Sequence, residues 1–76
     1  MKISIKYFAS MRETMGKADD TAELSDGATV NDLWSSVSNI PMIDNTLIAV
    51  NMEYTNAEHA LADGDEVAFF PPVTGG

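Results

Sequence analysis

Apolar and polar residues alternate near the start of the chain, over residues 2–8. Successive side chains of a β-strand point to opposite faces, so this alternation predicts a strand with one buried face. That face would carry Ile3, Ile5 and Tyr7. Phe8 falls on the opposite face, among polar residues, and is expected to be exposed there.

A second alternating segment, residues 66–70, lies close to the C-terminus. Val67 and Phe69 share one face of this predicted strand, whereas Glu66, Ala68 and Phe70 share the other. Phe70 is therefore a second aromatic residue on a face that otherwise carries polar or small residues. Exposed aromatic residues can be scattered surface positions, but two of them also fit the anchors of a protein interface. The sequence favours the interface.

Apolar residues return at helical spacing in the middle of the chain. Positions i, i+3, i+4 and i+7 of this stripe are Val30, Leu33, Trp34 and Val37. Thr29 precedes the stripe as a potential N-cap, and Asp32 occupies the N3 position. We therefore predict the main helix here, with Trp34 in the core rather than in a ligand site.

Shorter patterns assign the remaining elements. Residues 9–16 are predicted to form a short helix with Ser10 as N-cap and Gly16 at its end. Residues 21–24 are predicted as an edge strand, residues 47–51 as a strand, and residues 52–56 as a short strand or a turn. Together the elements predict an α+β roll in which a mixed sheet of about four to five strands is covered on one face by one main helix. The domain would span residues 1–70, with residues 71–76 as an extended, flexible C-terminal tail.

Charge and composition narrow the classes of function. The 76 residues include 12 acidic and 4 basic side chains, for a net charge of −8, and no cysteine. Nucleic acids and anionic membranes bind clustered Lys and Arg, so neither is expected as a partner, and a basic protein surface is the better complement. No apolar stretch approaches the ~20 residues of a membrane span or the form of a signal peptide. We therefore expect a cytoplasmic protein.

The sequence carries no recognisable catalytic or metal-binding motif. It has no Ser-His-Asp set, no glycine-rich phosphate loop, no paired carboxylates in an apolar setting and no metal-ligand spacing. His59 is the one histidine and is expected to have a structural or solvent-exposed role. The remaining candidate for chemistry is the C-terminal carboxylate of Gly76.

The C-terminal segment combines two conformationally restricted prolines with two glycines. Pro71 and Pro72 lack backbone donors and end the preceding strand, whereas Gly75 and Gly76 have no side chains and fit where other residues would clash. An extended chain over residues 71–76 reaches about 20 Å, far enough to enter the active site of another protein. A frayed terminus without function is the alternative.

Several of these segments together resemble the small subunit of molybdopterin synthase. The resemblance is carried by residues 63–76, which end in Pro-Pro-Val-Thr-Gly-Gly, by residues 7–13 (Tyr-Phe-Ala-Ser-Met-Arg-Glu) and by the Ala-Val-Asn of residues 49–51. It covers the whole chain in length and element order. It implies the ubiquitin-like β-grasp fold.

The resemblance also implies a sulfur carrier that binds no cofactor or metal itself. An ATP-dependent, ubiquitin-activating-like adenylyltransferase would activate Gly76, and a desulfurase- or rhodanese-type donor would supply the sulfur of a thiocarboxylate. The tail would then enter the large subunit, which would hold the catalytic groups, and the sulfur would pass to the cyclic pterin precursor of molybdopterin. Two carriers would act for each dithiolene, in a heterotetramer.

Residue roles follow from the same resemblance. Gly76 matches the sulfur-bearing residue, and the rest of the tail matches the segment that the large subunit receives: Gly75, Thr74, Val73, Pro72 and Pro71. Phe70 and Phe8 match contacts to the large subunit, and Tyr54 stands where the family usually has an aliphatic contact. Two alternatives remain open, a ubiquitin-like modifier that forms isopeptide bonds with lysines and a sulfur carrier of the thiazole pathway.

Overall fold

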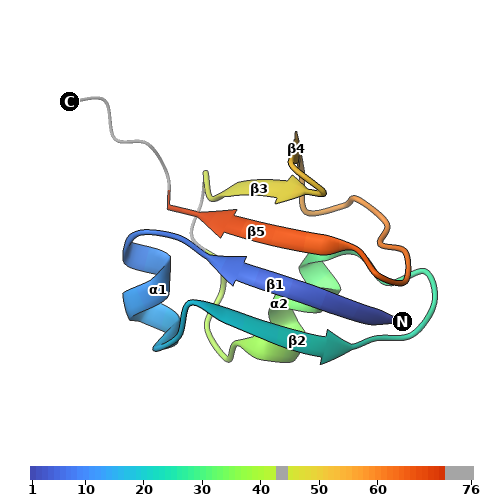
Figure 1. Cartoon of the computed structure of the whole chain (residues 1–76), viewed down its shortest axis with the longest axis horizontal. Coiled ribbons are helices and arrows are strands. Elements are labelled where there is room, and N and C mark those ends of the chain that lie inside the picture. Colours follow the sequence, from blue (N-terminus) through green and yellow to red (C-terminus); the bar gives the residue numbers. More distant parts are fainter. Residues whose placement is uncertain (43–44, 72–76) are drawn as a thin grey trace.

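The computed structural model describes residues 1–42 and 45–71. Within them the order of elements is β1 (Lys2–Tyr7), α1 (Ser10–Met15), β2 (Asp19–Glu23), α2 (Val30–Val37), β3 (Leu47–Val50), β4 (Glu53–Thr55) and β5 (Glu66–Phe70) (Figure 1). The five strands form one sheet in the order β2-β1-β5-β3-β4. Helix α2 packs against one face of this sheet, and α1 lies at the end where β1 finishes (Figure 1).

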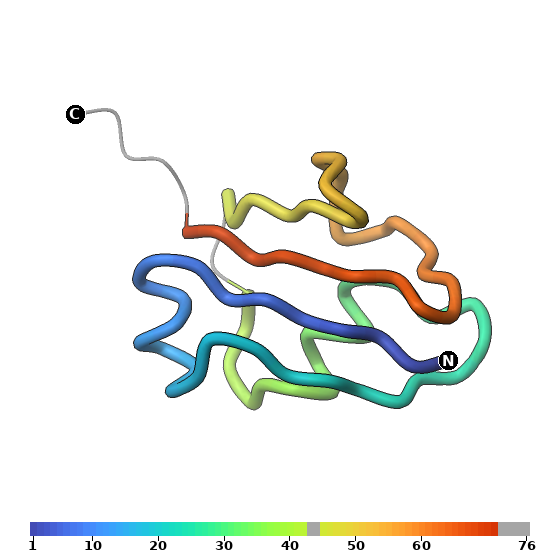
Figure 2. Tube along the Cα trace, viewed as in Figure 1, coloured from blue at the N-terminus to red at the C-terminus, as the bar shows by residue number. Residues whose placement is uncertain are grey.

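The sheet is mixed because β1 and β5 run parallel while the other neighbouring strands are antiparallel. In the parallel pair Ser4 lies opposite Glu66 and Tyr7 lies opposite Phe69. The first and last strands of the chain are therefore side by side, as the blue and red segments of Figure 2 show. Their C-terminal ends meet at one edge of the molecule.

The strand alternation predicted from the sequence is confirmed. Ile3, Ile5 and Tyr7 of β1 and Val67 and Phe69 of β5 are all buried in one core cluster beneath α2. The alternate residues of both strands lie on the face that α2 does not cover, which we call the open face.

The predicted main helix and its core tryptophan are also confirmed. The Thr29 hydroxyl accepts a hydrogen bond from the Asp32 amide (3.3 Å), and the Asp32 carboxylate accepts one from the Thr29 amide (2.9 Å). Trp34 is 3% exposed, its ring lies edge-on to that of Phe69, and its indole nitrogen donates to the Ile40 carbonyl (2.8 Å). A ligand platform at Trp34 is thereby ruled out.

The prediction that Ser10 caps the first helix is wrong. Ser10 is the first residue of α1, and the N-cap position belongs to Ala9, which makes no side-chain capping bond. Ala9 has φ 52° and ψ −128°, a backbone region that favours glycine. The end of the helix is as predicted, because Gly16 adopts a left-handed conformation and its amide donates to the Arg12 carbonyl (2.9 Å).

The smaller strands differ from the predictions at their bounds. The edge strand β2 begins two residues earlier than predicted and ends at Glu23, and β3 ends at Val50. The ambiguous segment after β3 contains both predicted forms: a turn at Asn51 and Met52, both with positive φ, followed by the short strand β4. Neither helix of the described residues is long and apolar enough to cross a membrane.

The Tyr7 hydroxyl is buried and makes no hydrogen bond to any of the described residues. Burial and, to a smaller extent, the negative charge of Asp20 raise the pKa of Tyr7 to about 12. The phenol therefore stays neutral at physiological pH, and Tyr7 acts as a core residue rather than as an acid or base.

Candidate functional site

Three aromatic side chains from separate parts of the sequence meet on the open face. Phe8 directly follows β1, Phe70 ends β5, and Tyr54 lies in β4. The parallel register of β1 and β5 places the first two next to each other, and the pairing of Ala49 with both Tyr54 and Ala68 brings the third to the same face. We call Phe8, Tyr54 and Phe70 the aromatic surface.

The rings of the aromatic surface contact one another. Phe8 and Phe70 stack with their ring centroids 4.6 Å apart and their planes inclined by 6°. Tyr54 lies at a tilt to Phe70, with centroids 6.2 Å apart. Phe8 is 36% exposed and Tyr54 is 73% exposed, whereas Phe70 is half-buried between them. The predicted outward placement of both phenylalanines is confirmed, and they form one contiguous patch rather than scattered positions.

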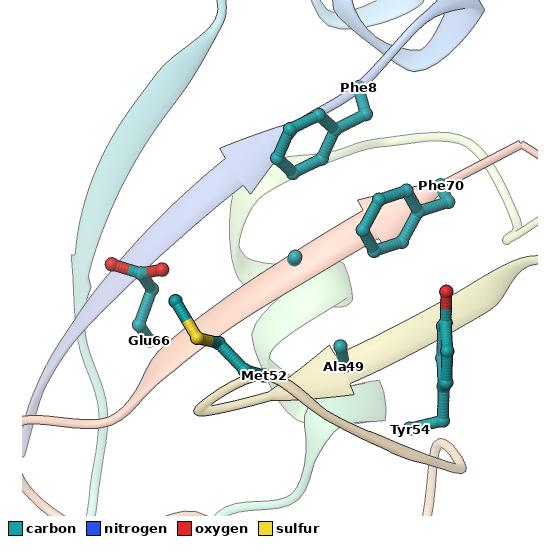
Figure 3. A pocket seen from close by; sticks show the side chains of 7 residues that line it. Phe8, Ala49, Met52, Tyr54, Glu66 and Phe70 are labelled. Carbon is teal, nitrogen blue, oxygen red and sulfur yellow. The ribbon is translucent and has the colours of Figure 1, made fainter.

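A depression of about 260 Å³ lies beside these rings (Figure 3). Seven residues line it: Phe8, Ala49, Met52, Tyr54, Glu66, Ala68 and Phe70. Ala49 and Ala68 lie opposite each other in the pairing of β3 with β5, and their small side chains leave the space between the larger ones open. Most of its lining is apolar, which suits the side chain of a partner protein.

Met52 and Ala49 were not identified from the sequence as part of this site. Met52 belongs to the turn between β3 and β4, and only the tertiary pairing of β3 with β5 brings that turn beside Glu66. A signal was nevertheless present, because an apolar residue directly after Asn51, at the tip of a hairpin, is unusual for a tight turn.

Backbone contacts fix the position of Phe8. Its amide donates to the Phe69 carbonyl (3.1 Å), and its carbonyl accepts from the Met11 amide (3.0 Å). The next residue, Ala9, holds the unfavourable backbone conformation described above, which turns the chain sharply from β1 into α1. The backbone of Phe8 is thus held between a strand and a helix, and its ring stacks on Phe70, so little conformational freedom remains to be lost when a partner binds.

Metal-ligating side chains do not gather into a site within the described residues. These residues contain no group of three or more His, Asp or Glu side chains placed to hold a metal ion. The ring of His59 is exposed and its Nδ1 shares a hydrogen bond with the Thr55 hydroxyl (3.2 Å), as expected for a structural role.

The structure places only the first residue of the predicted tail. Pro71 directly follows β5 and is half-buried, next to the aromatic surface. The sequence predicts an extended tail with a reactive terminus, and this prediction concerns residues outside those that the structure describes: Pro72, Val73, Thr74, Gly75 and Gly76.

Residues 5–76 match the model of the ThiS family. This chain belongs to the ThiS family. The predicted resemblance is therefore confirmed at the level of the family.

Two relatives in this family have closely similar sequences. A molybdopterin synthase sulfur carrier subunit from Chlamydomonas reinhardtii is 41% identical, and the match covers all of both chains. A protein with the same description from Escherichia coli K12 is 40% identical over 97% of this chain and 99% of the relative. Their similarity extends from end to end and is not confined to a motif.

Solved structures confirm the ubiquitin-like β-grasp fold. A Pyrococcus furiosus protein described as subunit 1 of a molybdopterin converting factor superposes with a TM-score of 0.78 at 34% identity, covering 96% of this chain and 99% of that one. Small archaeal modifier protein 1 from Haloferax volcanii superposes with a TM-score of 0.84 at 27% identity over the whole of both chains. The ThiS-family chain is thus similar to sulfur carriers and to protein modifiers.

Proposed function

We propose that this chain is the sulfur carrier subunit of a molybdopterin synthase. The observation that carries the proposal is the end-to-end identity of 41% to a protein of that function, together with an aromatic surface directly beside the point where the predicted tail begins. Further partners would be an ATP-dependent adenylyltransferase and a desulfurase- or rhodanese-type sulfur donor. Because ATP and these enzymes are needed, we propose the cytoplasm as the compartment.

The chemistry proposed for Gly76 follows from the properties of a carboxylate. A free C-terminal carboxylate, with a pKa of about 3.3–3.7, is ionised at neutral pH, and its carbon is a poor electrophile. Attack on the α-phosphate of ATP would form an acyl adenylate and release pyrophosphate. A sulfide equivalent would then displace AMP and leave a thiocarboxylate, whose anionic sulfur is a nucleophile without help from a neighbouring base.

The described residues support a division of roles between this chain and its partners. Phe8 and Phe70 carry no ionisable group, so the aromatic surface would dock the chain, and the partner would provide the acid and base groups. In the synthase, the sulfur would pass from Gly76 to the cyclic pterin precursor, and hydrolysis would return the carboxylate for another cycle. Two such transfers would complete one dithiolene.

Intact mass spectrometry tests the proposed carrier role directly. After incubation with the adenylyltransferase, ATP and a sulfur donor, the chain is expected to gain about 16 Da, the difference between oxygen and sulfur in a thiocarboxylate. Omission of ATP should prevent the gain. An unchanged mass, with the same enzymes active on another carrier, would contradict the proposal.

Charge placed on the aromatic surface is expected to disrupt docking. Phe8→Lys and Phe70→Lys should each weaken binding to the large synthase subunit by about 2 kcal/mol, roughly 30-fold in Kd, because a central aromatic anchor is replaced by a strongly hydrated group. Isothermal titration calorimetry measures the effect. Ile40→Lys is the matched control, since Ile40 is an exposed apolar residue that does not line the depression. Parent-like binding by both phenylalanine variants would show that this face is not the docking surface.

A protein modifier is the second candidate function. It is favoured by the 27% identity to small archaeal modifier protein 1 and by the 28% identity to small archaeal modifier protein 3 of Haloferax volcanii, each over the whole of this chain. In that role the adenylated Gly76 would acylate lysine side chains of target proteins. Isopeptide-linked conjugates that survive a denaturing gel and disappear when Gly76 is deleted would support it. The thiazole-pathway carrier stays a weaker alternative, which coupling to a thiazole synthase would reveal.

A further inference from the structure

Met52 combines high exposure with an unfavourable backbone conformation. Its side chain is 93% exposed, the largest fraction among the exposed large apolar residues of the described chain. Its φ is 71°, in the left-handed region, where the second central residue of a tight hairpin turn is usually glycine. An apolar side chain in water gains nothing from this position, so the folded chain itself gives no reason for a methionine here.

The turn that carries Met52 is held in place by the residue before it. The Asn51 amide donates to the Glu66 carbonyl (2.8 Å), and the Asn51 side-chain oxygen accepts from the Glu66 amide (3.0 Å). The Asn51 side-chain nitrogen donates to the Asp65 carboxylate (2.9 Å), which also accepts from the Ala62 amide (2.8 Å). These bonds tie the turn to the start of β5 and offset the strain at positive φ. Met52 is therefore held at a defined place on the open face.

Glu66 stands beside Met52 at the same end of the depression. Figure 3 shows the Met52 side chain extending toward Glu66, on the side of the sheet that also carries Phe8 and Phe70. The Glu66 carboxylate is exposed. It takes part in no ion pair, because the one ion pair among the described residues joins Lys17 and Asp20. An apolar group and a free negative charge thus adjoin the aromatic surface.

The charge distribution indicates what could meet this area. Lys17 is the last basic residue of the sequence, and every acidic residue except Glu13 follows it. The neighbouring strand β1 carries Lys2 and Lys6 on the same open face, with Lys6 opposite Ala68, but neither forms an ion pair with Glu66. Complementarity favours a partner that supplies a positive charge at this place.

We propose that Met52 and Glu66 form a second contact area of the docking surface, which receives an apolar pocket bordered by an arginine or lysine of the partner. The inference rests on the proposed function, because the partner is the protein that receives the tail. The alanine floor of the depression joins this area to the aromatic surface, so one partner can cover both. The aromatic surface anchors the partner, and the second area selects it through a thioether and a negative charge, both carried at positions where the backbone is held by hydrogen bonds.

Met52→Gly separates binding from folding. Glycine suits positive φ, so the thermal midpoint of the chain is expected to stay the same or to rise. Loss of a buried methionine contact should weaken binding to the large synthase subunit about tenfold. Ile40→Ala, the truncation of an exposed apolar residue outside the depression, should leave Kd within about twofold of the parent. Unchanged affinity of Met52→Gly would overturn the proposal.

Glu66→Gln tests the charge while preserving the shape of the side chain. Association with the large subunit is expected to slow several-fold at low ionic strength, and its dependence on salt should become flatter. Glu58→Gln removes an equally exposed carboxylate that does not line the depression, and it should show neither change. If Glu66→Gln and the parent show the same salt dependence, the charge of Glu66 does not contribute to association, and that part of the proposal is wrong.

The results also separate a failure of the second contact area from a failure of the proposed docking function. If Phe70→Lys weakens binding but Met52→Gly and Glu66→Gln bind like the parent, the aromatic surface docks the partner and the second contact area is wrong. If none of these variants changes binding, the proposed docking function itself fails. If the chain alone forms a dimer in sedimentation experiments and Met52→Gly is monomeric, a second copy of the chain covers the second contact area, and the proposal is overturned.

Discussion

Deletion of Gly76 is expected to abolish sulfur transfer while leaving the fold intact. Each residue of an extended chain contributes about 3.3–3.6 Å, so the shortened tail would hold its carboxylate that far from the reacting position in both the activating enzyme and the synthase. A misplacement of even 1 Å can cost about 100-fold in rate, and product formation should therefore fall at least that far. The residue follows the packed sheet in sequence, so its loss should not alter the core.

Two measurements on the same variant check this expectation. Molybdopterin formation is assayed with the large subunit, the activating enzyme, ATP and a sulfur donor, and the thermal midpoint is measured in parallel. Glu58→Gln, an exposed change outside the depression, is the control for both. A truncated chain that still gains sulfur and supports product would show that Gly76 is not the carrier residue.

Phe69→Ala is expected to remove a large part of the stability of the domain. Phe69 is fully buried, stacks on Tyr7 with ring centroids 6.2 Å apart, and receives the edge of Trp34 at 5.1 Å. Truncation of a buried phenylalanine costs about 3–5 kcal/mol, from lost burial and from the cavity that remains. At about 0.05–0.15 kcal/mol per residue, a 76-residue domain has roughly 4–11 kcal/mol of stability, so the urea midpoint of the variant should fall strongly.

The neighbouring residue provides a matched control for the loss of Phe69. Phe70 is the same residue type, next in sequence, on the opposite face of β5, and half-buried. Phe70→Ala should cost only about 1 kcal/mol of stability, mainly through the loss of stacking on Phe8, while it weakens partner binding. Urea denaturation of both variants gives the comparison. Equal losses of stability would contradict the division of β5 into a core face and a docking face.

Several features of the fold could be predicted from local patterns because their causes are local. Strand alternation depends only on the opposite directions of successive side chains, so it correctly placed Tyr7 inside and Phe8 outside. The capped start of α2 depends on hydrogen bonds between Thr29 and Asp32, three residues apart. The prediction that Ser10 caps α1 was wrong because its cause is not local. The chain passes from β1 into α1 through a strained turn at Ala9, which the tertiary path of the chain imposes.

The candidate site was predicted in part. Phe8 and Phe70 were recognised as outward-facing aromatic residues, and the structure shows them stacked on each other. Tyr54 was included on resemblance alone, and the structure brings it to the same surface. Met52 was missed, because its exposure depends on a turn conformation and on the hydrogen bonds of Asn51 to the start of β5, which join segments distant in sequence.

The sequence by itself determined which side of β1 and of β5 is buried, where the main helix begins, and the family to which the chain belongs. The first two properties follow from spacings of one to four residues, and the family follows from segments spread along the chain. Only the tertiary structure decided that β1 and β5 lie side by side and parallel, which turns two separate aromatic residues into one stacked surface. The physical reason is that pairing between distant strands is set by burial of the whole core, and no local pattern specifies which strand becomes the neighbour of another.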